Sequence, residues 1–444
     1  MNLEKPNRLQ TDWPFKANKL PFFYGWAIAV LSTLGFLMSI PGQTIGMAVF
    51  ADVFIERSGL SRTELSTAYL LGTLGSAFLL TRAGQWYDRL GARTMIVAAS
   101  VLLAIMLLFL SFAPDAGRAF AQELGVAALY TSGPLMVIGY FGVRFAGQGV
   151  LTSASRNVLL VWFEKRRGLV SGVRGVFVSL GFSIAPLLIA LLIDAAGWQG
   201  ALLWMAGGVG IVFAALALLT IRDHPRVSGL EPDGADLSNA DEAQTRTEVK
   251  NFTLAQARRS AVFWIYSLAL SMHALFGTAV TFHVVAIFEA AGRSRSEAFA
   301  YFIPQAVVSL LTNLTASALA DHMRLKPLLI FMLCAFIAGA MGLINLESTS
   351  GYYLLIAGFG MGGGLWGVLS NLVFVRQFGT LHLGAISGLN TSLKVTASAI
   401  GPAFFSLALD NYGTFNAAAY GCMAGLIVLL IVAIAIRQPL DRKP

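Results

Sequence analysis

The chain has 444 residues, of which 56% are hydrophobic and only 12% are charged. A soluble domain carries about 25% charged residues, so this composition excludes an ordinary soluble protein. The net charge of +8 would suit a nucleic-acid-binding protein, but the cations are distributed as membrane topology requires, which makes nucleic acid a poor partner.

Long apolar runs with few charges follow one another along most of the sequence. Runs of 18 or more such residues are typical of transmembrane helices, so the lipid bilayer is a predicted partner. The sequence predicts twelve spans, at residues 22–49, 63–82, 94–112, 132–161, 168–194, 198–221, 261–289, 297–320, 327–346, 351–375, 384–409 and 415–436.

A polar segment, residues 222–260, separates the sixth span from the seventh. It is acidic and has no long apolar run, so we expect a flexible linker whose end can form a short helix on the membrane surface. The predicted fold class is an all-α polytopic membrane protein with two six-helix bundles. The predicted domains are residues 1–221, the cytoplasmic linker 222–260, and residues 261–444 with the tail.

Lysines and arginines are divided unequally between the two sides of the predicted membrane. If the N-terminus is cytoplasmic, 22 of the 31 cations lie inside and 5 lie outside. Because cytoplasmic loops carry the excess of positive charge, both termini are predicted to be cytoplasmic. A bacterial inner membrane is the expected location.

The loop between the second and third spans reads GQWYDRLGAR and starts at Gly84. Glycines allow a tight turn and a close approach of two helices, which are the roles expected of Gly84 and Gly91. The carboxylate of Asp88 can lie against a helix N-terminus, and Arg89 and Arg93 can bind carboxylates or helix C-terminal carbonyls. Such contacts would hold one conformation and break in another.

The two halves of the sequence repeat each other. Residues 168–197 align without a gap with residues 384–413, including a shared S-G pair and a shared proline. Parallel repeats of six helices are typical of transporters that hold substrate between the halves near the bilayer midplane. A pair of charges from the loop also recurs with the same spacing: Asp88 and Arg93, then Asp321 and Lys326.

The GQWYDRLGAR loop resembles the signature loop of the major facilitator superfamily, with Ala92 in place of a basic residue. Arg144 in RFAGQG and the WFEKRRG segment are similar to that family as well. Within it, YGW at 24–26, FGTLHLGAISG and a lysine in span eleven resemble the oxalate/formate antiporter and monocarboxylate porter branch. The resemblance implies that Lys394 faces the anion, whereas span eight lacks the arginine expected for a dicarboxylate such as oxalate.

Lys394 and Arg144 are cations placed near the middle of predicted spans. A basic residue at the helix centre costs about 2.5–3.5 kcal/mol, so such a residue usually pairs or lines a cavity. All 23 acidic residues fall in the termini, the loops, the linker or at span ends. An interior with cations and no anions suits a substrate that brings the negative charge, although Arg144 is equally well explained by helix packing.

Four further polar residues are candidates for the substrate site. His273 lies near the middle of span seven, where it can carry a proton or remain neutral and structural. Asn313, Asn371 and Gln43, which follows a Pro41–Gly42 break in span one, can line the cavity or bridge helices.

We therefore predict a secondary active transporter that moves a small organic anion by alternating access, as an antiporter with a counter-anion or as a proton symporter. One alternative is an exporter of hydrophobic or cationic compounds, which should need an acidic or aromatic cavity. Another is a non-transporting membrane sensor. No catalytic, metal-binding or nucleotide-binding motif is present in the sequence, so neither an enzyme nor a cofactor is expected.

Overall fold

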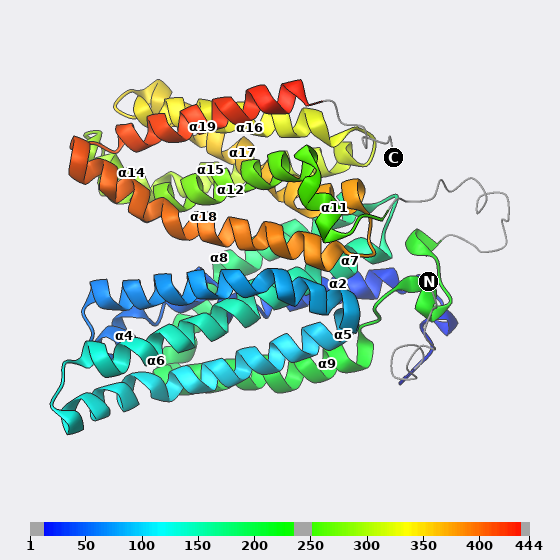
Figure 1. Ribbon diagram of the computed structural model, residues 1–444, viewed down its shortest axis with the longest axis horizontal. Helices are drawn as coiled ribbons and strands as arrows, with labels where there is room; N and C mark the ends of the chain where they lie inside the picture. Colours follow the sequence, from blue (N-terminus) through cyan, green and yellow to red (C-terminus); the bar gives the residue numbers. More distant parts are fainter. Residues whose placement is uncertain (1–12, 235–250, 437–444) are drawn as a thin grey trace. The chain divides into compact units, whose positions relative to one another are not determined.

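The computed structural model describes residues 13–234 and 251–436. Within these ranges every regular element is a helix (Figure 1). The predicted all-α fold class is therefore confirmed. The apolar composition explains this outcome, because a helix satisfies all of its backbone hydrogen bonds within one segment of chain.

Ten helical stretches in the described residues are long and apolar enough to cross a membrane. Two of them have double length, and each contains a glycine with non-helical backbone: Gly91 (φ 84°, ψ 167°) in α5 (Arg62–Leu124) and Gly197 (φ 72°, ψ 165°) in α8 (Arg167–Gly207). Positive φ favours glycine because it has no Cβ. Each double-length stretch accommodates two of the predicted spans, so the ten stretches account for all twelve.

The described residues cluster into two units, and several helices belong to one unit only. Unit 1 comprises residues 13–164, 177–234 and 382–392, and unit 2 comprises residues 165–176, 251–381 and 393–436. Two helices, α8 and α18 (Leu383–Tyr412), contribute residues to both units. The predicted domain boundaries remain a prediction.

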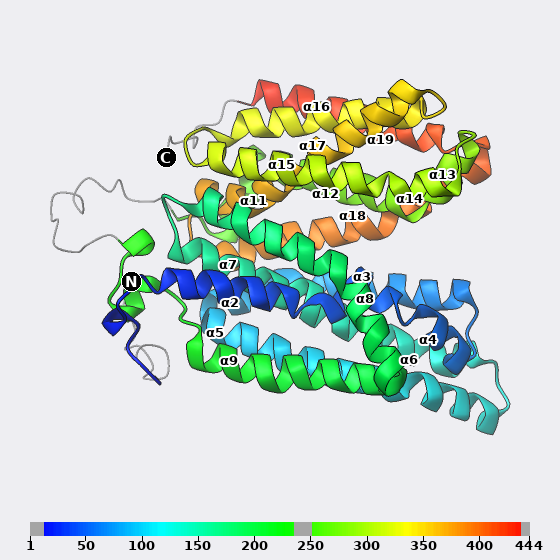
Figure 2. The same cartoon turned by 180° about the vertical axis from the view of Figure 1, so that it is seen from behind.

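The other helices of unit 1 are shorter than α5. They are α2 (Gly25–Leu37), α3 (Thr44–Ala48), α4 (Ala51–Ser58), α6 (Ala128–Val143), α7 (Thr152–Trp162) and α9 (Ala214–Thr220). Two π-helical segments, η3 (Arg144–Leu151) and η4 (Gly208–Phe213), join α6 to α7 and α8 to α9. Figure 2 shows α2 beside α7, and the two helices are in contact.

Unit 2 contains most of the remaining helices, and α16 and α17 pack closely in it. Its helices are α11 (Leu254–Arg259), α12 (Ala261–Phe282), α13 (Val284–Ala290), α14 (Arg295–Ala300), α15 (Phe302–Ala320), α16 (Leu325–Ile344), α17 (Thr349–Phe378) and α19 (Asn416–Ala435).

A long helical hairpin is formed by the second part of α5 and by α6, which lie side by side (Figure 1). After Gly91, α5 continues to Leu124, well past the predicted end of span three at residue 112. It ends at Gly125, which is left-handed (φ 64°), the usual stop signal of a helix. A Cβ at Gly125 would have nothing within 4 Å.

Span one is broken where Pro41 and Gly42 predicted a break, in a short 3-10 turn between α2 and α3 (Ile40–Gly42). The backbone of Gly42 lies against that of Gly147, since a Cβ on Gly42 would lie 2.7 Å from the Gly147 Cα. Gly147 belongs to the π-helical segment η3, which the sequence analysis did not predict. Such segments often occur at functional sites.

Within the predicted linker 222–260, the described residues at the start form 3-10 turns that the prediction did not include. Residues Pro225–Ser228 and Pro232–Gly234 form 3-10 turns. Arg222 is buried, and its carbonyl accepts a hydrogen bond from the Trp162 indole (3.0 Å). Contacts of this kind hold the start of the linker, residues 222–234, against the rest of unit 1. At the other end α11 forms, as predicted for NFTLAQARRS, with a capping box between Thr253 and Gln256.

Candidate functional site

In unit 1, the carboxylate of the signature-loop aspartate caps a helix. The two oxygens of Asp88 accept hydrogen bonds from the backbone N–H groups of Gly384 (2.7 Å) and Ala385 (2.8 Å), in the first turn of α18. Those N–H groups have no partner within the helix, and the positive end of the helix dipole favours a carboxylate there. The contact is the arrangement that the sequence analysis proposed for Asp88, with α18 as its partner.

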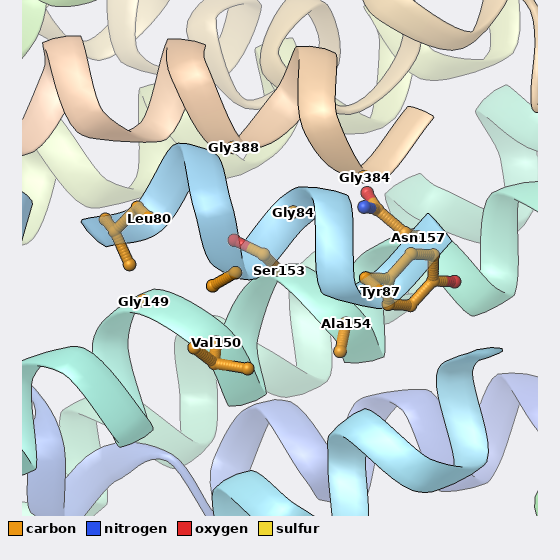
Figure 3. Close-up of a pocket in the computed structure, with 11 residues that line it drawn as sticks. Leu80, Gly84, Tyr87, Gly149, Val150, Ser153, Ala154, Asn157, Gly384 and Gly388 are labelled. Carbon is orange, nitrogen blue, oxygen red and sulfur yellow. The ribbon is translucent and has the colours of Figure 1, made fainter. Parts of the chain in front are cut away.

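Gly84 allows α5 and α18 to approach closely beside this cap. A Cβ on Gly84 would lie 2.0 Å from the carbonyl oxygen of Gly384, and a Cβ on Gly388 would lie 2.6 Å from that of Leu80. Figure 3 shows these glycines on the facing sides of the two helices. Together with Asn157 and neighbouring residues they line a cavity of about 20 Å³, enough for about one water molecule, so the contact is a tight backbone crossing and too small for a substrate.

A second carboxylate, which the sequence analysis missed, caps the part of α5 that follows the glycine break. Asp223 accepts a hydrogen bond from the Arg93 N–H (2.7 Å). Its carboxylate lies 2.5 Å from where a Cβ of Gly91 would be, so Gly91 is required both by its φ and by this contact. Burial raises the pKa of Asp223, while the Arg93 amide and guanidinium oppose that shift.

Arg93 itself binds the C-terminal end of α9. Its Nε donates to the carbonyl of Ile221 (2.8 Å) and an Nη donates to that of Trp13 (2.9 Å). A cation is favourable at this end of a helix. Arg89 differs, because it is exposed and makes no hydrogen bond or ion pair with the residues that the structure describes.

Unit 2 repeats both contacts with the residues that the sequence repeat singled out. Asp321 accepts from the N–H groups of Gly168 (2.7 Å) and Leu169 (2.9 Å), in the first turn of α8. Lys326 Nζ donates to the carbonyls of Ile434 (2.9 Å) and Ile436 (2.6 Å), at the end of α19. The repeated sequence therefore has a repeated structure: a carboxylate on a helix N-terminus and a cation on a helix C-terminus.

One partner is present in unit 2 that the sequence analysis did not predict. The Arg376 guanidinium pairs with Asp321 (3.0 Å) and also donates to the carbonyl of Ala320. Asp88 has no ion pair among the described residues. The two caps thus differ in charge: a cation neutralises Asp321, whereas backbone amides alone balance Asp88.

Lys394, Trp366 and His273 lie together in unit 2. The Lys394 ammonium is 5.1 Å from the centroid of the Trp366 ring and is only 9% exposed. Trp366 is held in place by its indole N–H, which donates to the carbonyl of Leu270 (3.0 Å). The His273 ring lies 5.0 Å from that indole and stacks on Phe336 at 4.6 Å. Trp366 was not among the predicted site residues.

The other predicted mid-span cation, Arg144, lies in unit 1 at the start of η3 and is 3% exposed. Its Nη1 donates to Thr44 Oγ1 (3.2 Å) and to the carbonyl of Gly42 (3.4 Å), while the Tyr69 ring lies 5.2 Å from its guanidinium carbon. The Nε atom is buried without a hydrogen-bond partner among the described residues. Arg144 therefore holds the break in span one and keeps one donor unused.

The three predicted amide candidates bridge helices. Gln43 donates to Ser39 Oγ and to Thr152 Oγ1 (3.1 and 3.0 Å). Asn313 donates to the carbonyl of Gly364 (3.0 Å), which ties α15 to α17. Asn371 accepts from the Arg174 guanidinium (3.0 Å). The sequence allowed these side chains either to line the cavity or to bridge helices, and the contacts found here are helix bridges. A role of the three residues in substrate binding stays a prediction.

No group of three or more histidine, cysteine, aspartate or glutamate side chains in the described part of the chain is placed to hold a metal ion. The candidate site residues include buried cations, aromatic rings and capped helix N-termini. The cations can bind an anion, and opening of the caps would allow the helices to change conformation.

Residues 31–402 match the family model of the Major Facilitator Superfamily. The hexuronate transporter of Bacillus subtilis is 21% identical over 97% of this chain and 97% of its own length. The probable sulfoacetate transporter SauU of Cupriavidus necator is 21% identical over 41% of this chain and 38% of its own length.

Among solved structures, the proton:xylose symporter XylE, crystallised with 6-bromo-6-deoxy-D-glucose, superimposes with a TM-score of 0.66. The match covers 95% of this chain and 97% of that one at 16% identity, so the similarity concerns the fold alone.

Proposed function

Because the chain belongs to the Major Facilitator Superfamily and is a multi-pass membrane transporter, we propose that its substrate is a small organic anion, moved by alternating access. The observation that carries this proposal is the buried ammonium of Lys394 against the Trp366 ring, about eleven residues into α18. The names of two relatives, a hexuronate and a probable sulfoacetate transporter, support the same substrate class.

The chemistry of Lys394 suits a carboxylate or a sulfonate. An ammonium has three donors, and a charge-assisted hydrogen bond to an anionic oxygen is about twice as strong as a neutral one. The Trp366 face can stabilise the ammonium while no anion is bound, since cation–π contacts contribute about 0.5–2 kcal/mol. The indole is fixed by its bond to Leu270, so it limits the side from which an anion reaches the ammonium.

Arg144 is the corresponding cation of unit 1. Its unused Nε is a donor in the interior of a membrane-spanning segment, where an unpaired polar group costs several kcal/mol. In this proposal, the substrate anion or a water molecule satisfies that donor during part of the transport cycle.

The two capped helix N-termini are the proposed conformational couplers. Asp88 caps α18, the same helix that carries Lys394, and Asp321 caps α8. Opening such a cap costs about 0.5–2 kcal/mol, which is small enough to be offset by the binding of an anion. We place both termini in the cytoplasm of a bacterial cell on the distribution of positive charge. The narrower likeness to oxalate/formate antiporters stays a prediction.

Counterflow in proteoliposomes tests the substrate class. A thermal-shift panel of mono- and dicarboxylates, sulfonates and amphipathic cations would select the ligands. The counterflow of each anionic hit should fall by about tenfold or more in Lys394→Gln, because the lost charge-assisted bond is worth about 1.5–3 kcal/mol. Lys19→Gln, at an exposed lysine, is the matched control.

Equal counterflow by Lys394→Gln and wild type would show that Lys394 does not bind the substrate. Stabilisation by amphipathic cations alone, with no anionic hit, would instead favour the exporter.

A further inference from the structure

Polar groups lie along one ridge of α18, in unit 2. Lys394, Ser398, Pro402 and Ser406 follow at intervals of four residues, so they share one face of the helix. This face is turned toward α12, because a Cβ on the adjacent Gly401 would lie 2.2 Å from the carbonyl oxygen of Leu275.

Two side chains from α12 and its end contact this ridge. The hydroxyls of Thr278 and Ser398 are 2.8 Å apart. One helical turn beyond Ser398, the His283 Nε2 lies 3.0 Å from the carbonyl oxygen of Pro402 and 3.3 Å from the hydroxyl of Ser406. The polar groups thus form a ladder that runs from Lys394 to His283, the residue that follows the last residue of α12.

The partner of His283 determines which ring nitrogen carries the proton. A carbonyl oxygen only accepts hydrogen bonds, so we assign the hydrogen to Nε2, which faces Pro402. In the neutral ring, Nδ1 then has a free lone pair and can take up a proton while both contacts of Nε2 persist. His273 is different, because its Nδ1 is buried without a hydrogen-bond partner among the described residues, and a proton there would have no acceptor.

The groups in contact with the His283 ring are aromatic, and acidic and basic residues lie on the neighbouring elements. The ring contacts the aromatic rings of Phe282 (5.0 Å between centroids) and Phe415 (5.4 Å). No ion pair joins it to a carboxylate within the described residues. The acidic and basic residues on the elements around it are His273, Glu289, Glu347, Lys394 and Asp410.

We propose that His283 is the proton-binding residue of this transporter and that the Thr278–Ser398 ladder connects it with Lys394. The inference rests on the proposed function, since it assumes an anion at Lys394. A proton from water binds to the Nδ1 lone pair of neutral His283, which becomes an imidazolium, and it returns to water when that N–H bond breaks. The rungs on α18 are about 6 Å apart, a gap that one water molecule bridges.

Charge balance gives a reason for such a proton. With Lys394 charged, the empty interior carries one positive charge at this site, and a bound monoanion reduces that charge to zero. A proton on His283 restores it, so the empty and the fully loaded carrier have the same charge. The membrane potential, which contributes about 2.3 kcal/mol per charge and 100 mV, then acts equally on both. One proton per monoanion is the expected stoichiometry.

Proton-driven accumulation in proteoliposomes tests this proposal. With a monocarboxylate that gives counterflow, an inward gradient of one pH unit should produce about tenfold accumulation by the wild type, because one proton per anion supplies about 1.4 kcal/mol. His283→Gln should equilibrate the anion without accumulating it, while its counterflow persists. A pH-sensitive dye inside the vesicles should record proton entry with the wild type and none with His283→Gln. His322→Gln, at an exposed histidine outside the ladder, should still accumulate about tenfold.

A second variant tests the proposal even if the His283→Gln protein does not fold. Thr278→Val preserves the shape of the side chain and removes one rung of the ladder, so proton-driven uptake should slow several-fold at unchanged counterflow. If His283→Gln accumulated the anion tenfold, the inference about His283 would be wrong and the proposed function would stand. The same conclusion would follow if the wild type gave counterflow but a pH gradient had no effect on it. Absence of counterflow with every anion in the wild type would refute the proposed function and this inference with it.

Discussion

Replacing Asp88 by asparagine should open the first turn of α18. The carboxylate of Asp88 accepts hydrogen bonds from the N–H groups of Gly384 and Ala385, at 2.7 and 2.8 Å. Asparagine keeps one acceptor oxygen but loses the second oxygen and the charge. Because a cap residue contributes about 0.5–2 kcal/mol and a charged hydrogen bond about 1.5–3 kcal/mol, we expect Asp88→Asn to cost about 1–2 kcal/mol. That cost corresponds to about 5- to 30-fold more frequent local opening.

Hydrogen exchange measured by mass spectrometry reports this opening directly. A peptide that covers residues 383–388 should exchange about 5- to 30-fold faster in Asp88→Asn, whereas a peptide that covers residues 167–172 should be unchanged. Asp321→Asn is the matched control and should have the opposite pattern, because Asp321 caps the other helix. Unchanged exchange at 383–388, or an equal increase in both peptides, would show that Asp88 does not stabilise α18 in the way the contacts indicate.

Two further predictions concern packing and pH. Gly84→Ala should lower the thermal unfolding temperature and transport, because its Cβ would lie 2.0 Å from the Gly384 carbonyl oxygen, whereas Gly207→Ala, with nothing within 4 Å, should be neutral or stabilising. His224 is half-buried beside Arg226, and the burial of its ring lowers its pKa to about 4. Its neutral form therefore stabilises the fold fully above pH 6.5. This stability, about 3 kcal/mol at most, should be lost as the pH falls toward 4, and His224→Asn should flatten that dependence of the unfolding temperature on pH.

Much of the fold was predictable because it follows from local and periodic features of the sequence. Apolar length predicted the spans, and Pro41 and Gly42 predicted the break after α2. In the signature loop, the small residues at Gly84 and Gly91 indicated a close approach and a turn before any partner was known. The recurrence of an aspartate and a cation at a fixed spacing indicated that Asp321 repeats the role of the first-half aspartate.

The partners of these residues could not be predicted, because they come from distant parts of the chain. Asp223 is the first acidic residue after span six, yet only the fold places it on the N-terminal end of the second part of α5. Arg376 directly follows the predicted span 351–375, and only the fold brings it to Asp321, with which it pairs. The π-helical segment that begins at Arg144 depends on backbone hydrogen bonding, for which the sequence has no clear signal.

The amide candidates show a second limit. Polar side chains in a membrane either line a cavity or bridge helices, and their residue type does not distinguish the two. Asn313 is tied to a backbone carbonyl of α17, a partner that only the packing of α15 against the glycine-rich α17 brings within reach. Trp366 was not predicted as a site residue for the same reason, since only the fold places its ring against the Lys394 ammonium.

The α5–α6 hairpin has a practical consequence for experimental structure determination. From Gly91 to Leu124 the helix is about 50 Å long, whereas the hydrocarbon core of a bilayer is about 30 Å thick. Some 20 Å of paired helix can therefore stand clear of the lipid, and the tip at Gly125 has open space around it. A rigid helical fusion or an antibody fragment attached at that tip would give a small transporter, otherwise hidden in its detergent micelle, a visible landmark for image alignment.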